Sequence, residues 1–407
     1  MKKTIVLSVI TASMLLANGY KIPEQSLSGM ALSAANVANA NGADTNYYNP
    51  ANMVFNKNKN SFELLISYIH LYPIKFEDSA GGNYETRKED FVIPQFHFSS
   101  KDLSGWRWGI SITTPAGLSK RWDDVTPKAT AQEFTLKTVE INPTIAHKLN
   151  NNIGLAFGFR AVRSEGTANA MKAGLYSQYL NGTSWDYGWN AALSYQNDQR
   201  DIKCALTYRS KIDLKLEGDA SGYYNKYLIT KNKTDLGTLI SFNTSGKVTL
   251  PIPAALNVAF AKTFDKTTIE VVFERTFWSK YKNLNFDFSN PYVEGKFGKP
   301  KNKNWRDENT YRIGLTHKCT EKLTAMLGYA YDNNPIPDST VEYSLPDSDK
   351  HIFSGGIKYK LDDRMSLGFS ALYAKQKKRN VKNTYVGQGT FKDGGSLLMA
   401  FGMDYSF

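Results

Sequence analysis

The sequence predicts an all-β transmembrane protein, in which fourteen antiparallel strands close into a barrel around a small N-terminal plug. Three observations predict this fold. The chain has 407 residues, 13% of them aromatic, and after its N-terminus it lacks an apolar run long enough for a membrane-spanning helix. Its segments alternate between apolar and polar residues with a period of two. The connections between these segments are short and long in turn, which is typical of bacterial outer-membrane barrels.

The N-terminus has the pattern of a signal peptide over residues 1–19. Lys2 and Lys3 precede an apolar stretch, residues 5–17, and small residues follow it. We therefore expect an exported protein whose mature chain begins near Tyr20. The formal net charge of +12 suggests nucleic acid as a partner only for a protein that stays in the cytoplasm. In an outer membrane, the anionic groups of lipid and lipopolysaccharide are the expected counter-charge.

Residues 20–60 do not alternate and are too few for a separate domain. They are rich in Ala, Asn, Ser and Gly, a composition that favours short helical pieces packed inside a wide barrel. The sequence thus predicts a plug, also called a hatch, in the lumen. A periplasmic tail without a role is the alternative.

Residues 61–407 are expected to form the barrel. The clearest strand is the last, where every second residue from Leu397 to Phe407 is apolar and the chain ends on an aromatic residue. This ending favours recognition by the outer-membrane assembly machinery. The fourteen expected strands are residues 61–74, 88–100, 105–114, 132–149, 152–164, 184–196, 200–214, 247–263, 266–280, 306–318, 322–332, 350–360, 364–376 and 395–407.

Two prolines interrupt expected strands. Pro94 and Pro143 lack the N–H group that a strand donates to its neighbour, so each marks a bulge or a local gap in pairing. Such a gap is either a bland irregularity or a wall defect used as a passage. Arg275 is a further exception, because the alternation turns it toward lipid unless it lies near the outer rim.

Catalytic and metal-binding patterns are missing from the sequence. The five histidines fall in separate segments, and there is neither a Gly-x-Ser-x-Gly elbow nor a phosphate-binding loop. We expect no enzyme activity, no cofactor, no catalytic residue and no metal ligand. A triad assembled only in space is the alternative that sequence leaves open.

Several motifs resemble those of the FadL family of outer-membrane long-chain fatty acid and hydrocarbon transporters. The most specific is the run from Gly19 to Ser26, followed by residues 42–44 and 47–53, which is similar to the family's N-terminal plug with its Asn-Pro-Ala signature. The resemblance covers nearly the whole mature chain. It implies a plugged barrel that binds a ligand in an outer groove, passes it to a lumenal pocket and releases it sideways. Further similar stretches are residues 114–119, 121–122, 141–146, 305–307, 311–315, 328–332 and 345–347.

The expected outer groove lies in two long loops. The spacing of apolar residues over residues 171–180 would give a helix in the first loop an apolar face. Tyrosines dominate the second loop. These side chains either contact the ligand or cover the mouth of the barrel. The candidate groove residues are Met171, Leu175, Tyr176, Tyr179, Leu180, Tyr223, Tyr224, Tyr227 and Leu228.

The resemblance also implies lumenal and gap residues. From the expected plug these are Tyr20 and Ile22, with the signature residues Asn49, Pro50 and Ala51. The strand pattern turns Arg160 and Arg312 inward, where small neighbours leave room for a carboxylate contact. A lateral gap is implied at Pro115, Ala116 and Gly117.

These observations favour uptake of hydrophobic small molecules, most of all long-chain fatty acids, by a monomer without nucleic-acid partners. A general aqueous porin and a structural or adhesive barrel are the alternatives. A porin has no use for greasy loops, and adhesion leaves the plug unexplained.

Overall fold

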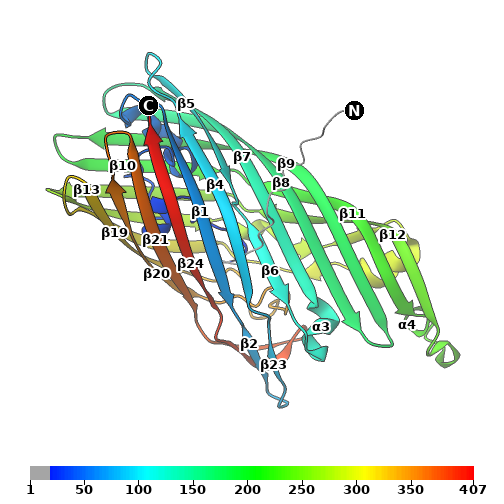
Figure 1. Cartoon of the computed structure of the whole chain (residues 1–407). Coiled ribbons are helices and arrows are strands. Elements are labelled where there is room, and N and C mark those ends of the chain that lie inside the picture. Colours follow the sequence, from blue (N-terminus) through cyan, green and yellow to red (C-terminus); the bar gives the residue numbers. More distant parts are fainter. Residues whose placement is uncertain (1–18) are drawn as a thin grey trace.

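The computed structural model describes residues 19–407 (Figure 1). The expected signal peptide lies outside the described residues except for Gly19. The protein is a closed antiparallel barrel of 14 strands, as predicted. The sheet closes because β1 pairs with β4 on one side and with β24, the last strand, on the other. No helix within residues 19–407 has the length and apolar character needed to cross a membrane.

Eleven of the wall strands are single elements and three are interrupted once. The interrupted strands are β5 (Trp106–Thr113) with β6 (Gly117–Arg121), β10 (Ile202–Arg209) with β11 (Ile212–Asn225), and β12 (Leu239–Ile252) with β13 (Ala255–Phe264). The single elements are β1 (Ser61–Tyr72), β4 (Glu89–Ser99), β7 (Glu133–Lys148), β8 (Ile153–Lys172), β9 (Tyr176–Asn197), β14 (Thr267–Thr276), β18 (Glu308–Lys318), β19 (Leu323–Asp332), β20 (Lys350–Lys360), β21 (Met365–Gln376) and β24 (Gly395–Ser406).

The alternation of the sequence becomes the two faces of the wall. On β24, Leu398 is 0% exposed and points inward, whereas Phe401 is 69% exposed on the outer face. Both prolines mark gaps in pairing: β7 and β8 pair on either side of residues 142–143, and Pro94 lies in a longer gap described below. Arg275 lies at the loop end of β14, where it pairs with Asp307 at 3.0 Å.

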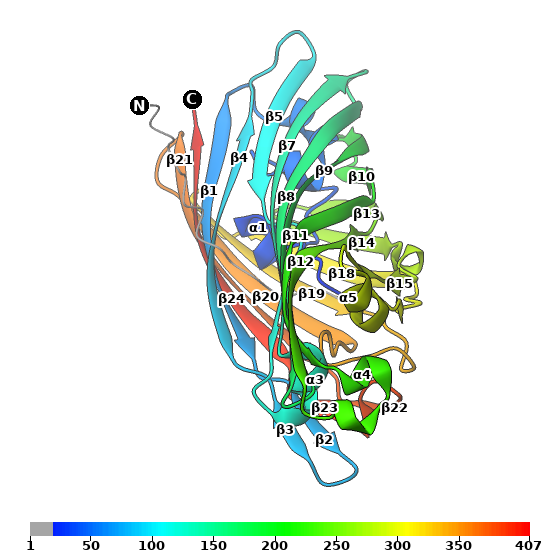
Figure 2. The same ribbon diagram turned by 90° about the vertical axis from the view of Figure 1, so that its right-hand side faces the viewer.

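Small elements gather at the end of the barrel opposite the short turns (Figures 1 and 2). They include a four-stranded sheet and several short helices beside the long loops. These elements are β2 (Lys75–Asp78), β3 (Asn83–Glu85), β22 (Arg379–Asn383), β23 (Gly387–Lys392), β15 (Asn283–Leu284), β16 (Phe286–Phe288), β17 (Lys301–Asn302), α3 (Val125–Ala131), α4 (Tyr227–Thr230), α5 (Pro291–Phe297), η2 (Lys233–Asp235) and η3 (Trp278–Lys280).

The sequence analysis was wrong about the first long loop, because residues 161–185 form no helix. Strand β8 continues to Lys172 and β9 starts at Tyr176, so the two make one long hairpin. Similarly, β11 runs to Asn225 and β12 starts at Leu239. Toward the loop ends of these strands, the outward-facing residues are mostly polar. The sequence there no longer alternates between apolar and polar residues. The expected strands were therefore too short at this end.

Residues 19–56, called here the N-terminal segment, pack between the walls, as an expected plug would. They contain α1 (Leu27–Ala31), α2 (Thr45–Tyr48) and η1 (Pro50–Phe55), and Figure 2 shows α1 within the barrel. Glu270 of β14 accepts hydrogen bonds from the N–H groups of Val37 and Ala38, both at 2.7 Å. Glu63 of β1 accepts one from Leu27 at 2.9 Å. Buried carboxylates of the wall thus accept hydrogen bonds from backbone N–H groups of the N-terminal segment, which lacks the regular secondary structure that would pair them internally.

Candidate ligand-binding site and wall opening

The wall has an opening between β4 and the third wall strand, β5 with β6. At the turn end, β4 and β5 pair from Phe96 with Ile112 to Ser99 with Gly109. Toward the loops, the segments that continue these two strands come together again. There Thr86 forms a β-bridge with Trp122, and the Arg87 N–H donates to the Arg121 carbonyl at 2.9 Å. Between these contacts, residues 89–95 have no backbone partner on this side among residues 19–407.

The register is the same on both sides of the opening. Residue 96 pairs with residue 112 on the turn side of the opening, and residue 86 pairs with residue 122 on the loop side. Ten residues separate these two pairs along each strand, so both pairs belong to one antiparallel ladder. A slip of register therefore does not cause the gap. It arises because residues 113–120 bend away from β4 into the lumen.

The N-terminal segment holds the bend. The Ile22 N–H donates to the Pro115 carbonyl at 2.9 Å, and the Gly117 N–H donates to the Tyr20 carbonyl at 2.8 Å. The Gln25 side chain makes two hydrogen bonds with the backbone of Thr114, at 2.8 and 2.9 Å. Pro115, Ala116 and Gly117, the expected gap residues, thus lie at the bend itself. Pro94 lies in the unpaired stretch of β4, at an edge where a missing N–H is best tolerated.

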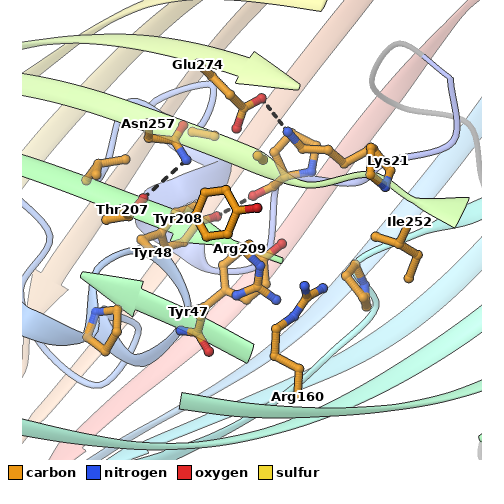
Figure 3. Close-up of a pocket in the computed structure, with 18 of the residues that line it drawn as sticks. Lys21, Tyr47, Tyr48, Arg160, Thr207, Tyr208, Arg209, Ile252, Asn257 and Glu274 are labelled. Carbon is orange, nitrogen blue, oxygen red and sulfur yellow. Dashed lines mark hydrogen bonds and ion pairs between the residues drawn. The ribbon is translucent and has the colours of Figure 1, made fainter. Parts of the chain in front are cut away.

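A cavity lies beside this bend, between the N-terminal segment and the wall (Figure 3). The space among its atoms is about 710 Å³, open solvent included. Both basic and apolar side chains line it. The lining residues include Lys21, Pro23, Tyr47, Tyr48, Pro50, Pro115, Arg160, Tyr208, Arg209, Ile252, Glu274 and Arg312.

Four cations of this lining share two carboxylates. Arg160 and Arg209 both pair with Glu140, the first at 2.8 Å. Lys21 and Arg312 both pair with Glu274, the second at 3.3 Å. Glu24, Glu308 and Asp332 add negative charge near Arg312. On the other side of the cavity, two arginines share Glu140, and this local excess of positive charge favours an anionic group.

Arg209 is the cation with unused hydrogen-bonding capacity. Its guanidinium lies 4.5 Å from the centre of the Tyr47 ring, a cation–π contact. Its buried Nη1 has no hydrogen-bond partner among the described residues. Arg160, by contrast, also donates to the Ser210 carbonyl at 2.7 Å, and Arg312 to the Ser33 carbonyl at 2.9 Å.

The structure divides the expected lumenal residues into two groups. Pro50, Arg160 and Arg312 line the cavity. Tyr20, Ile22, Asn49 and Ala51 are buried and hold the N-terminal segment in place: the Tyr20 hydroxyl donates to the Pro251 carbonyl at 2.6 Å, and Asn49 donates to Ser194 Oγ at 2.8 Å. Lys21, Tyr47 and Arg209 also line the cavity and were not among the expected site residues.

An apolar hollow lies between the extended hairpins at the loop end. Leu180, Leu216, Leu250 and Phe286 line it together with Phe134, and it has a volume of about 420 Å³. Their inward positions follow from strand parity, since Leu214 and Leu216 are also buried on β11.

Of the expected groove residues, Leu180 alone lines this hollow among the described residues. The Tyr176 ring packs 5.8 Å from Phe297, and Tyr224 stacks 6.3 Å from Phe242. Tyr179 is 48% exposed on the outer face, the opposite side of β9 from Leu180. Met171, Leu175, Tyr223, Tyr227 and Leu228 are half-buried at the hairpin tips.

One buried carboxyl of the N-terminal segment lacks a hydrogen-bond partner. Glu24 is 2% exposed, and neither of its carboxyl oxygens is hydrogen bonded among the described residues. Burial raises the pKa of Glu24 to about 7, against the opposing charge of Arg312 and with a smaller contribution from Asp332. Within residues 19–407, no group of His, Cys, Asp and Glu side chains could hold a metal ion.

A family model described as "Outer membrane protein transport protein (OMPP1/FadL/TodX)" matches residues 8–407. The chain belongs to this family. FadL-family members lie in the bacterial outer membrane, and so does this protein. It is 25% identical over 325 residues to the long-chain fatty acid transport protein of Escherichia coli (strain K12), which covers 71% of this chain and 72% of that protein. It is 23% identical to outer membrane protein P1 of Haemophilus influenzae (strain Rd), over 71% of this chain and 67% of that protein.

Solved structures of FadL-family members share the fold. A FadL homologue from Pseudomonas aeruginosa superimposes with a TM-score of 0.83 at 17% identity, over 96% of this chain and 100% of that one. The toluene transporter TodX from P. putida superimposes with a TM-score of 0.68 at 16% identity, over 94% and 99%. The strand count, the closure and the antiparallel order are therefore those of this family.

Proposed function

We propose that this FadL-family protein takes up hydrophobic small molecules that carry an anionic head group, long-chain fatty acids above all. The ligand lands at the loop end, moves to the lumenal cavity and leaves sideways between β4 and β6. The observation that carries this proposal is the wall opening, whose two ends keep one register while the strand between them bends inward. The relatives named for fatty acid transport support the ligand class.

The landing site is the apolar hollow between the extended hairpins. Leu180, Leu216 and Leu250 present aliphatic side chains there, and Phe134 and Phe286 present rings. Covering an alkyl chain in such a site contributes about 25 cal/mol for each Å² of apolar surface removed from water. Residues at the hairpin tips, including Leu175 and Tyr227, would make the first contact.

The lumenal cavity receives the head group. Its four cations share two carboxylates of the protein, so the carboxylate of a ligand could pair with a cation that is only partly neutralised. The free Nη1 of Arg209 offers a charge-assisted hydrogen bond, and Arg160 and Arg312 line the same space. The apolar tail would lie along Ile252 and Tyr208.

The exit is lateral because of the chemistry of the ligand. A path straight through to the aqueous periplasm would return the whole apolar tail to water. Passage between β4 and β6 delivers it into the bilayer, where its surface stays covered.

The N-terminal segment couples binding to exit. Tyr20 and Ile22 hydrogen bond to the bend, and Lys21 between them lines the cavity through its pairing with Glu274. A carboxylate that competes for Lys21 would loosen the hydrogen bonds on both sides of it. The bent residues 113–120 would then be free to move.

A general aqueous porin would need an unobstructed polar lumen, and the proposed plug would obstruct it. A structural or adhesive barrel would need neither the basic cavity nor the opening. We propose a monomer that is inserted by the outer-membrane assembly machinery and surrounded by lipopolysaccharide, without enzyme activity.

The test compares ligand binding with uptake. Ala116→Phe places a ring at the bend, and we expect the purified variant to bind a fluorescent fatty acid normally while cells that carry it take up little. Ala205→Phe, a buried position on β10 away from the opening, is the matched control. Heat modifiability on gels checks that both variants fold. Wild-type uptake by folded Ala116→Phe would disprove the lateral route.

A further inference from the structure

A second cavity lies on the loop side of the bend, apart from the one in Figure 3. Lys120 of β6, Lys350 of β20, Gln376 of β21 and Ser396 of β24 line it, with Tyr72 of β1. We call it the lysine cavity. Its free space, about 20 Å³ for the centres of water-sized groups, suits one or two such groups.

Lys120 is buried there without a protein acceptor. It is 4% exposed, and among the described residues no hydrogen bond or ion pair involves its ammonium group. Its neighbours in sequence take the nearest carboxylate on β4: Glu89 accepts from Ser119 Oγ at 2.6 Å and pairs with Arg121.

The other nearby carboxylate is also fully used. Asp347 Oδ1 pairs with Lys350 Nζ at 2.8 Å and accepts from Gln376 Nε2 at 2.9 Å. Its Oδ2 accepts from the Gly19 N–H at 2.7 Å. Neither Glu89 nor Asp347 is thus hydrogen bonded to Lys120, whose ammonium group lines the cavity without an acceptor among the described residues.

A buried charge without a partner is costly, and proteins supply such a partner from a side chain or a bound ion. We propose that the lysine cavity binds a small monovalent anion, of halide or carboxylate size, between Lys120 and the Lys350–Asp347 pair. Its donors, the Lys120 ammonium group and the Ser396 hydroxyl, are of the kind that an anion requires.

The position gives the anion a structural consequence. Lys120 belongs to the bent part of the third wall strand, whereas Lys350, Gln376 and Ser396 belong to β20, β21 and β24, which lie beyond β4 and β1 around the wall. A bound anion would tie the bend to the wall on the other side of the opening. This role does not depend on which molecule the barrel transports.

Thermal unfolding of the detergent-purified full chain tests the site. We expect the melting temperature to rise with sodium bromide and to level off, compared with sodium gluconate at equal ionic strength, since gluconate is too large for the cavity. Lys120→Met should abolish this rise. Lys88→Met, which removes an exposed lysine near the same opening, should keep it. An equal rise in Lys120→Met and wild type, or none in wild type, overturns the proposal.

Crystals soaked in bromide give a readout that does not depend on a variant's folding. An anomalous peak between Lys120 and Lys350 supports the site, and a cavity without one overturns it. Acetate, the smallest carboxylate that fits the proposed size, then identifies the class of anion. Loss of the bromide peak in acetate assigns the site to small carboxylates as well as halides, and persistence of the peak assigns it to halide alone.

Discussion

Replacement of Arg209 by Met should weaken binding of a fatty acid much more than binding of the matching fatty alcohol. Arg209 lines the lumenal cavity, and its Nη1 is buried without a partner. An incoming carboxylate would fill that vacancy with a charge-assisted hydrogen bond, whereas an alcohol would bring no charge. Met keeps much of the aliphatic length of arginine, so the apolar contacts of the tail change little.

The magnitude follows from the charges. A hydrogen bond to a charged group contributes about 1.5–3 kcal/mol, which corresponds to a factor of roughly 10 to 150 in the dissociation constant. The alcohol should lose less than about threefold, or about 0.7 kcal/mol. Glu140 keeps Arg160 as its partner at 2.8 Å, so the variant does not leave this carboxylate alone.

The assay is displacement of a fluorescent fatty acid from the purified barrel by oleate and by oleyl alcohol. Arg275→Met is the matched control, because this arginine pairs with Asp307 on the outside of the cavity. Both ligands should bind Arg275→Met as they bind wild type. An equal loss for acid and alcohol in Arg209→Met would show that the arginine shapes the cavity without contacting the head group.

Four further outcomes are expected. Leu180→Ala should weaken ligand binding by about 1.5–3 kcal/mol through lost apolar contact, while Tyr179→Ala on the opposite face of the strand should not, and equal effects in titrations would contradict the inward landing site. The pKa of Glu24 rises from 4.5 to about 7 on folding; its contribution to stability is therefore greatest below pH 4.5 and is lost as pH rises toward 7, by roughly 3 kcal/mol. Denaturant unfolding of Glu24→Gln should show a weaker pH dependence than wild type over this range, and an unchanged one would disprove the assignment. Deletion of residues 19–56 should raise single-channel conductance in planar bilayers, and unchanged conductance would mean that the segment does not block the lumen. Deletion of Phe407 should lower the amount of heat-modifiable barrel in outer membranes. An unchanged amount would show that the assembly machinery does not recognise the last residue.

The barrel could be predicted because its wall obeys one simple rule. Lipid on one side of the wall and a packed lumen on the other require apolar and small or polar side chains to alternate. Each strand can therefore be recognised in the sequence, as from Leu397 to Phe407. The rule fails where water replaces lipid. Residues 165–183 form strands with polar outer faces, and without lipid no apolar residue is required there.

The site was predictable in kind but not in its pairings. Parity alone turns Arg160, Arg209 and Arg312 inward, yet only the folded chain shows that Glu140 serves two arginines and Glu274 serves Arg312 and Lys21. Most of the expected groove residues lie outside the apolar hollow for a related reason. A spacing of four residues suits one face of a helix, but it also suits one face of a strand, and the strand at Tyr179 turns that face outward.

The unpaired stretch of β4 changes what the bilayer meets at the barrel surface. Along residues 89–95, backbone N–H and C=O groups have no backbone partner on one side within residues 19–407, and hydrocarbon cannot satisfy them. Water or a polar head group must do so, which makes the rim of the opening a hydrophilic notch in an otherwise greasy belt. A molecule with one polar end can stay hydrogen bonded to this rim while its tail is already among the lipids. On the proposed lateral route, the notch would favour amphiphiles over plain hydrocarbons at the last step, through the backbone and without any dedicated side chain.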